Sequence, residues 1–109
     1  MTETLLFKYP EFHDGVNLSV RRGLKWSNVK GLTRCGKPNE PTLGIVEILY
    51  TQVMRFCDLE HTDYLQYEHA EDCRDMNGLT QAMEEVYPDF NPFELVTLIW
   101  FVKISIFNK

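Results

Sequence analysis

Residues 94–107 constrain the fold more than any other segment of the chain. A period of two in apolar residues is that of a β-strand, whose successive side chains point to opposite faces. A strand with so long an apolar face lies at the middle of a sheet or barrel core. We therefore expect a sheet protein with this segment near its centre. The residues that set the period are Val96, Leu98, Trp100, Val102, Ile104 and Ile106.

Four earlier segments have the character of strands. They are residues 5–9, residues 16–22, a weaker segment within 26–35 and a long one over 42–56. A turn at PEFHDG, ending at Gly15, separates the first two. The long segment is expected to bend or bulge near Thr51 and Gln52. In it we expect one face to carry Val46, Ile48 and Tyr50.

The strand at residues 16–22 alternates clearly between apolar and polar side chains. This alternation predicts one face on the core and one away from it. The core face carries Val16, Leu18 and Val20, and the other carries Asn17, Ser19 and Arg21.

Two helices are expected between the fourth and fifth strands. Thr62 can cap a short helix that runs to about Ala70, because its hydroxyl can accept from free first-turn amides. Asp75 or Asn77 can cap a second helix, which Pro88 ends. The apolar stripe of that helix is Leu79, Met83 and Val86. The order β-β-β-β-α-α-β predicts one α+β domain over residues 1–109, with a small, curved, partly closed sheet and two helices before its last strand.

Charge is unevenly distributed along this acidic chain, whose net charge is −5. Residues 1–44 carry seven Lys and Arg against four Asp and Glu, whereas residues 45–109 carry four against twelve. This balance excludes a generally basic nucleic-acid coat protein but permits a local basic site. The stretch SVRRGLKWSNVK is the candidate, with guanidinium and ammonium groups for phosphate and an indole ring for a base. Its candidate nucleic-acid-binding residues are Arg21, Arg22, Lys25, Trp26 and Lys30. The alternative is a solvated strand end with Trp26 packed in the core.

Ser19 is a candidate nucleophile in the same stretch. A serine hydroxyl needs a base within hydrogen-bond reach, and the neighbouring sequence contains no nucleophile-elbow motif. Lys25, Glu68 or Glu71 could supply that base only if tertiary folding brings one of them close. The alternative is an ordinary strand serine.

Two groups of residues in the second half of the chain are further candidates for a functional site. Two Cys and two His are the right ligand types for zinc, but their spacing is not that of a zinc knuckle, so we expect neither a metal nor another cofactor. The acidic run from Asp58 to Glu85 is expected to be the solvated face of helices. The alternatives are paired carboxylates that bind Mg²⁺ or act as acid and base, and a surface that mimics nucleic acid to bind a basic protein partner. The four potential ligands are Cys57, His61, His69 and Cys73.

The expected cellular location is based on three features that the sequence lacks. The three cysteines do not resemble a secreted disulfide framework, and the amino-terminal residues lack a signal-peptide pattern. No apolar run reaches the roughly 18 residues that span a bilayer. We therefore expect a cytoplasmic protein without a membrane partner.

Three stretches share their order and spacing with a known family. GVNLSVRRG is similar to a Gly-x-Lys-x-x-Thr-x-Arg strand, and TLGIVEILYTQVMRFCDL to a long apolar strand that ends in Phe-x-Asp-Leu. The segment EHAEDCRDMNGLTQAMEEVYPDFNPFELVTLIWFVKI is similar to a closing helix, a Tyr-Pro pair and a final strand. Together they resemble the ASCH group of small domains, over most of the chain from about residue 5 to about residue 105.

The resemblance implies a PUA-like β-barrel whose cleft, between barrel and helices, accepts RNA or a nucleotide. Some small members are amidohydrolases on an acylated cytidine, using a Lys, a Thr and a Glu. Ser19 stands at the Thr position and Arg21 at the Arg position, while Val16 stands at the Lys position and cannot act as a base. The Glu position falls near residues 71–73, so the implied catalytic set is Ser19 and Glu71, with Lys25 as a substitute for the missing lysine.

Three functions remain open at this stage. The first is a module that binds RNA, single-stranded nucleic acid or a modified nucleotide. The second is a small hydrolase, either an amidohydrolase or a ribonuclease, that uses Ser19. The third is an interaction or inhibitor protein that binds a partner through its acidic helices.

Overall fold

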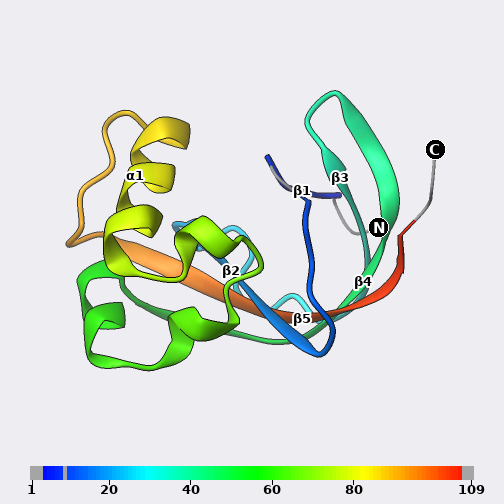
Figure 1. Ribbon diagram of the computed structural model, residues 1–109, viewed down its shortest axis with the longest axis horizontal. Coiled ribbons are helices and arrows are strands. Elements are labelled where there is room, and N and C mark those ends of the chain that lie inside the picture. The colour runs from blue at the N-terminus through cyan, green and yellow to red at the C-terminus, as the bar shows by residue number, and fades with distance from the viewer. Residues whose placement is uncertain (1–3, 9, 107–109) are drawn as a thin grey trace.

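A computed structural model describes residues 4–8 and 10–106 of the chain. It contains five strands, three short 3-10 segments and one α-helix (Figure 1). The strands are β1 (Leu5–Leu6), β2 (Val16–Arg22), β3 (Gly31–Lys37), β4 (Glu40–Arg55) and β5 (Leu95–Ile106). Between β4 and β5 lie η1 (Phe56–His61), η2 (Tyr64–Tyr67), η3 (Glu71–Cys73) and α1 (Met76–Val86).

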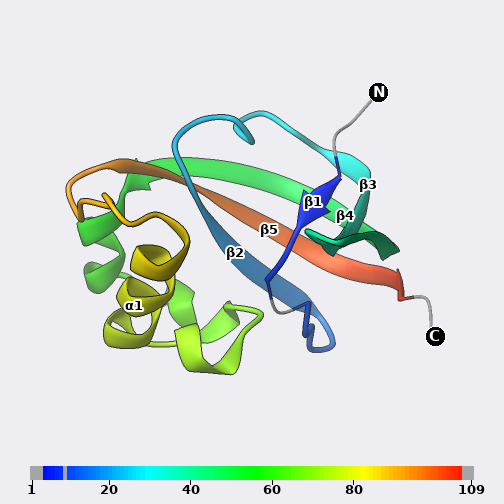
Figure 2. The ribbon, with the colours of Figure 1, turned by 90° about the horizontal axis from the view of Figure 1, so that it is seen from above.

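The strands form one sheet in the order β1-β3-β4-β5-β2. The sheet is strongly curled, so that it forms a half-barrel (Figure 2). The helical segment lies at one end of the sheet, and the β3–β4 hairpin curls away at the other (Figures 1 and 2). β5 pairs with β4 on one side and β2 on the other, which confirms its central position. The α+β class with a curved sheet is therefore confirmed.

Apolar side chains pack against both faces of this sheet. Because neighbouring residues of β5 point to opposite faces, Leu98 and Trp100 belong to one core, and Ile99 and Phe101 belong to the other. The first core lies under the helical segment, and the second lies under the amino-terminal segment and Trp26. The predicted division of β2 into a core face and an open face is therefore wrong. Its polar residues Asn17 and Ser19 are buried, and its first residue, Val16, is exposed.

A bulge in β4 changes another predicted face. The register with β5 shifts between Ile48 and Tyr50, which is close to the predicted bend. Ile48 therefore packs in the second core, whereas Tyr50 lies on the opposite face and stacks on Trp100, with ring centroids 5.9 Å apart. The expectation that Tyr50 shares a face with Val46 and Ile48 is wrong for this reason.

The second predicted helix is confirmed as α1. Its first turn is capped by Asp75, whose Oδ1 accepts a 2.8 Å hydrogen bond from the amide of Gly78. Leu79 and Met83 are buried against the sheet, but Val86, the third residue of the predicted stripe, is exposed. The helix ends before Pro88, as predicted.

The first predicted helix is reduced to the single 3-10 turn η2. The hydroxyl of Thr62 accepts from the amide of Tyr64 at 3.2 Å, as a cap would. The chain then extends, because Glu68 forms a β-bridge with Leu18 and the amide of His69 donates to the Leu18 carbonyl at 3.0 Å. An α-helix through residue 70 would remove this pairing with β2.

Two other boundaries differ from the sequence prediction. β1 is limited to two residues, and Tyr9, the predicted end of that strand, lies outside the described residues. The weak strand expected within residues 26–35 begins only at Gly31, because residues 23–28 form turns. Among the described residues, no helix has the length and apolar character needed to cross a membrane.

Candidate functional site

A cleft of about 540 Å³ separates β2 from α1, with the amino-terminal segment at its side. One wall is apolar, because α1 presents the inner part of its amphipathic surface there. The opposite wall carries polar and ionisable groups from β2 and from the segment after η2. The apolar lining includes Leu6, Phe7, Val20, Leu79, Ala82, Met83 and Val86, and the polar lining includes Lys8, Ser19, Arg21, Glu68, His69, Glu85 and Tyr87.

Ser19 and Arg21 lie on the cleft wall side by side. They are two residues apart on β2, so the strand projects them from the same face. The Nε of Arg21 donates to the Oγ of Ser19 at 3.0 Å, and its Nη1 donates to the carbonyl of Leu6 at 2.6 Å. The guanidinium carbon also lies 4.7 Å from the ring centroid of Phe7. These contacts fix the orientation of the guanidinium group.

The cation of Arg21 is held in a poorly solvated place. Desolvation lowers its pKa to about 10, so that the group stays charged at neutral pH. No carboxylate forms an ion pair with Arg21 within the part of the chain that the structure describes. An anionic or carbonyl group of a ligand would therefore find a positive charge on this wall.

Glu68 is the buried acid of the site, with 3% of its surface exposed. The β-bridge to Leu18 brings it beside β2, and its Oε1 accepts from the amide of Ala70 at 3.2 Å. Burial raises the pKa of this carboxyl to about 8, although the charge of Arg21 acts in the other direction. Glu68 is therefore mostly a neutral acid at neutral pH.

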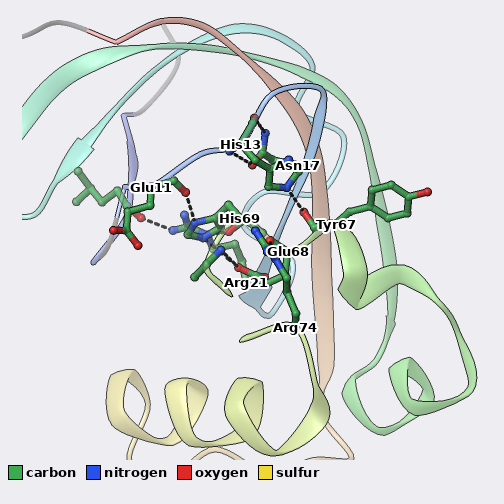
Figure 3. Close-up of polar contacts among 11 residues, drawn as sticks. Glu11, His13, Asn17, Arg21, Tyr67, Glu68, His69 and Arg74 are labelled. Atoms are coloured by element: carbon green, nitrogen blue, oxygen red, sulfur yellow. Dashed lines mark hydrogen bonds and ion pairs between the residues drawn. The ribbon is translucent and has the colours of Figure 1, made fainter. Parts of the chain in front are cut away.

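His69 completes the buried group (Figure 3). Its Nε2 lies 3.2 Å from the Oε1 of Glu68, and its Nδ1 lies 3.2 Å from the carbonyl oxygen of Glu11. Because a carbonyl oxygen can only accept, Nδ1 carries the proton and Nε2 is an acceptor. Burial lowers the pKa of His69 to about 4, which agrees with a neutral pair at neutral pH.

Backbone contacts around this pair hold it in place (Figure 3). The Nε of Arg74 donates to the Glu68 carbonyl at 2.9 Å, and the Nε2 of His13 lies 3.1 Å from the Tyr67 carbonyl. Asn17, buried on β2, donates from Nδ2 to the His13 carbonyl at 2.8 Å. The segment from Tyr67 to Ala70 is thus tied to β2, to the amino-terminal loop and to Arg74, which lies just before α1.

The structure brings Ser19 and Arg21 into the cleft, but the other predicted nucleic-acid-binding residues, Arg22, Lys25, Trp26 and Lys30, do not line it. Arg22 forms ion pairs with Glu94 at 2.6 Å and with Asp89 at 2.8 Å. Lys25 and Lys30 are exposed on and after the turn that follows β2. The ring of Trp26 is 8% exposed and packs in the second core, so the structure favours its packing role over base stacking.

Glu71, the acid that the sequence placed in the catalytic set, also does not line the cleft. It is exposed in η3, like most of the acidic run, and Glu68 takes the place beside β2 instead. The sequence contained no signal that would separate Glu68 from its solvated neighbours, because its burial depends on the bridge to Leu18. The role of His69 as partner of a buried acid was missed for the same reason.

The cysteines are free thiols. Cys73 lines the cleft, and burial raises its pKa to about 11, so that it is protonated at neutral pH. The four residues considered for zinc do not converge: within the described ranges, no group of three or more potential ligands comes together.

No protein-family model, curated protein or solved structure matches this chain.

Proposed function

We propose that the protein binds a nucleotide or a modified nucleoside, free or as part of RNA, in the cleft between β2 and α1. The observation that carries this proposal is that Ser19, Arg21 and Glu68, from two distant parts of the chain, line one cleft. Buried or poorly solvated ionisable groups in a cleft are typical of functional sites.

The size and lining of the cleft suit such a ligand. Its volume of about 540 Å³ lies within the roughly 300–1,000 Å³ of small-molecule sites. The apolar side chains of Ala82 and Val86, which are more exposed than those of Leu79 and Met83, offer a surface for a flat ring, and Arg21 offers a charge for a phosphate.

The buried acid adds selectivity for polar ring edges. A neutral carboxyl of Glu68 has both a donor and an acceptor, so it can pair with the amide-like edge of a base. The hydroxyl of Ser19 accepts from Arg21 and keeps its own proton for a ligand oxygen or nitrogen. Together these groups would recognise one heterocycle rather than a length of polymer.

The resemblance to the ASCH group supports the same ligand class. A strongly curled sheet with helical structure before its last strand is compatible with a PUA-like barrel, and we propose that fold family for this chain. In that proposal the cleft occupies the place between barrel and helices where members of the group accept RNA or a nucleotide.

Calorimetric titration with cytidine monophosphate, uridine monophosphate and a short single-stranded RNA tests the binding function. We expect Arg21→Gln and Ser19→Ala each to weaken binding, because each removes a donor from the cleft. The matched control is Lys30→Gln, which removes an exposed charge outside the cleft. Equal loss in the control would favour an extended surface, and unchanged affinity in both cleft variants would refute the proposal.

A second candidate function, hydrolysis of an acylated cytidine, is favoured by the 3.0 Å hydrogen bond from Arg21 to Ser19. In this reaction the Oγ of Ser19 attacks the acyl carbon, and its proton passes to the carboxylate form of Glu68. The amine then leaves with that proton, and water hydrolyses the acyl ester. Because only ionised Glu68 can accept the proton, the rate should rise with pH towards about 8.

Incubation with N4-acylated cytidine tests this second function. We expect turnover that Ser19→Ala and Glu68→Gln abolish and Glu71→Gln retains. If the wild-type protein binds nucleotides but shows no turnover, hydrolysis is excluded and nucleotide binding remains the proposed function.

A further inference from the structure

A second surface, away from the cleft, is formed by the open face of the sheet at the end that the helical segment does not cover (Figures 1 and 2). One row of paired residues crosses four strands there, running from Val16 to Val102, then to Glu47 and to Leu32. Val16 and Leu32 are exposed, and the exposed fraction of Leu32 is 67%. Exposed apolar side chains that gather on one face, unlike single scattered ones, are a feature of contact surfaces.

Aromatic rings continue this surface. Tyr50, which the bulge turns to this face, is 50% exposed and stacks on Trp100. Tyr67 is 40% exposed and packs edge-on against the same indole, with centroids 5.7 Å apart. The indole is thus buried under two tyrosines that themselves remain open. Rigid exposed tyrosines beside aliphatic side chains are the composition of interface cores.

Two opposite charges lie within the aliphatic part of this face. Arg34 is paired with Ile45 and Glu47 with Leu32, so the two charged residues are diagonal neighbours on β3 and β4. Neither side chain forms a hydrogen bond or an ion pair with another described residue. Each charge is therefore available to a group outside the chain.

We propose that this face, defined by Val16, Leu32, Arg34, Glu47, Tyr50 and Tyr67, is the contact surface between two copies of the chain. A two-fold axis that lies parallel to the sheet, between Arg34 and Glu47, places each of them opposite its counterpart. Arg34 then meets Glu47 of the partner subunit, and Glu47 meets Arg34 of the partner subunit, around stacked aliphatic and tyrosine side chains. Such self-complementary contacts are the commonest kind in homo-oligomers.

A nucleic-acid strand fits this face less well. The exposed tyrosines could stack on bases, but the charges of Arg34 and Glu47 cancel, so the strand positions of this face offer no basic track for phosphates. A second copy uses both charges, because it supplies an acid for the arginine and a base for the glutamate.

Sedimentation equilibrium over a range of protein concentrations tests the proposal with a charge-swap cycle. Wild type is expected to dimerise. Arg34→Glu and Glu47→Arg should each weaken dimerisation by at least about tenfold, because each places like charges opposite one another. The double variant restores both pairs and should regain most of the wild-type affinity. Lys25→Glu, the same charge change outside this face, should have no effect.

Three results would overturn the proposal. One is a wild type that stays monomeric at the highest concentrations. Another is a double variant that associates no better than the single variants, with circular dichroism showing that all of them are folded. The third is a monomer that binds a single-stranded oligonucleotide through Tyr50 and loses it in Tyr50→Ala.

Discussion

The buried pair of Glu68 and His69 gives the protein a specific dependence of stability on pH. The pKa of Glu68 is 4.5 in the unfolded chain and about 8 in the folded protein, and the pKa of His69 is 6.5 unfolded and about 4 folded. Between pH 4.5 and 6.5 the folded protein holds a proton on Glu68, and the unfolded chain holds one on His69. The two contributions to the pH dependence therefore cancel in this range.

Above pH 6.5 only the contribution of Glu68 remains. The unfolded chain has then lost both protons, while the folded protein keeps the one on Glu68 until the pH approaches 8. The folded protein then binds more protons than the unfolded chain, so a rise in pH destabilises it. The free energy of unfolding falls by about 1.4 kcal/mol per pH unit. Between pH 6.5 and pH 8, Glu68 alone lowers the free energy of unfolding by about 2 kcal/mol, and the remaining titration of His69 in the unfolded chain offsets a small part of this near pH 6.5.

Glu68→Gln isolates this contribution. The amide oxygen of the variant can accept from the amide of Ala70, as Glu68 does, but the side chain cannot ionise. We compare the free energies of unfolding of the variant and of wild type, measured by urea unfolding at pH 6.5 and at pH 8. The difference, variant minus wild type, should be about 2 kcal/mol larger at pH 8 than at pH 6.5. Glu71→Gln, an exposed neighbour, should follow wild type. If the free energy of unfolding changed with pH equally in Glu68→Gln and in wild type, Glu68 would not be a neutral acid in the folded protein.

Three further predictions concern the fold that holds the cleft, and each is checked by urea unfolding. Asp75→Ala should cost about 1 kcal/mol, because it removes the cap of α1, whereas Asp72→Ala should be nearly neutral; equal effects would contradict the capping role. Trp26→Ala should cost about 3–5 kcal/mol, because the ring packs in the second core, and a cost below 1 kcal/mol would instead place the ring at the surface. Gly44→Ala should destabilise, because an added Cβ would lie within 3 Å of the backbone oxygen of Ser105; a variant as stable as wild type would show that the β4–β5 pairing there is wider than described.

Segments with a strong local pattern were predicted well from the sequence. The two-residue period of β5 identified the central strand, and the cap at Asp75 with the Leu79 and Met83 stripe identified α1. In both cases the signal is set by residues within the element itself, so no knowledge of the partners is needed.

Features that depend on tertiary pairing were not predictable. The chain after η2 extends because it bridges to Leu18, and this long-range contact outweighs the local helix signal at Thr62. The same bridge selects Glu68 over Glu71 as the buried acid. The amino-terminal segment covers the polar face of β2. The alternation of residues 16–22 could not predict this burial, because it depends on a segment outside the strand.

The proposed function depends most directly on the binding of a ligand in the cleft beside Ser19 and Arg21. Two-dimensional proton–nitrogen NMR of the labelled protein, titrated with cytidine monophosphate, tests this directly. We predict saturable shifts at the amides of Ser19, Arg21, His69 and Met83, which line the cleft, and their loss in Arg21→Gln. Saturable shifts confined to the turn at Lys25 and to Lys30, or no saturable shifts at all, would contradict the claim.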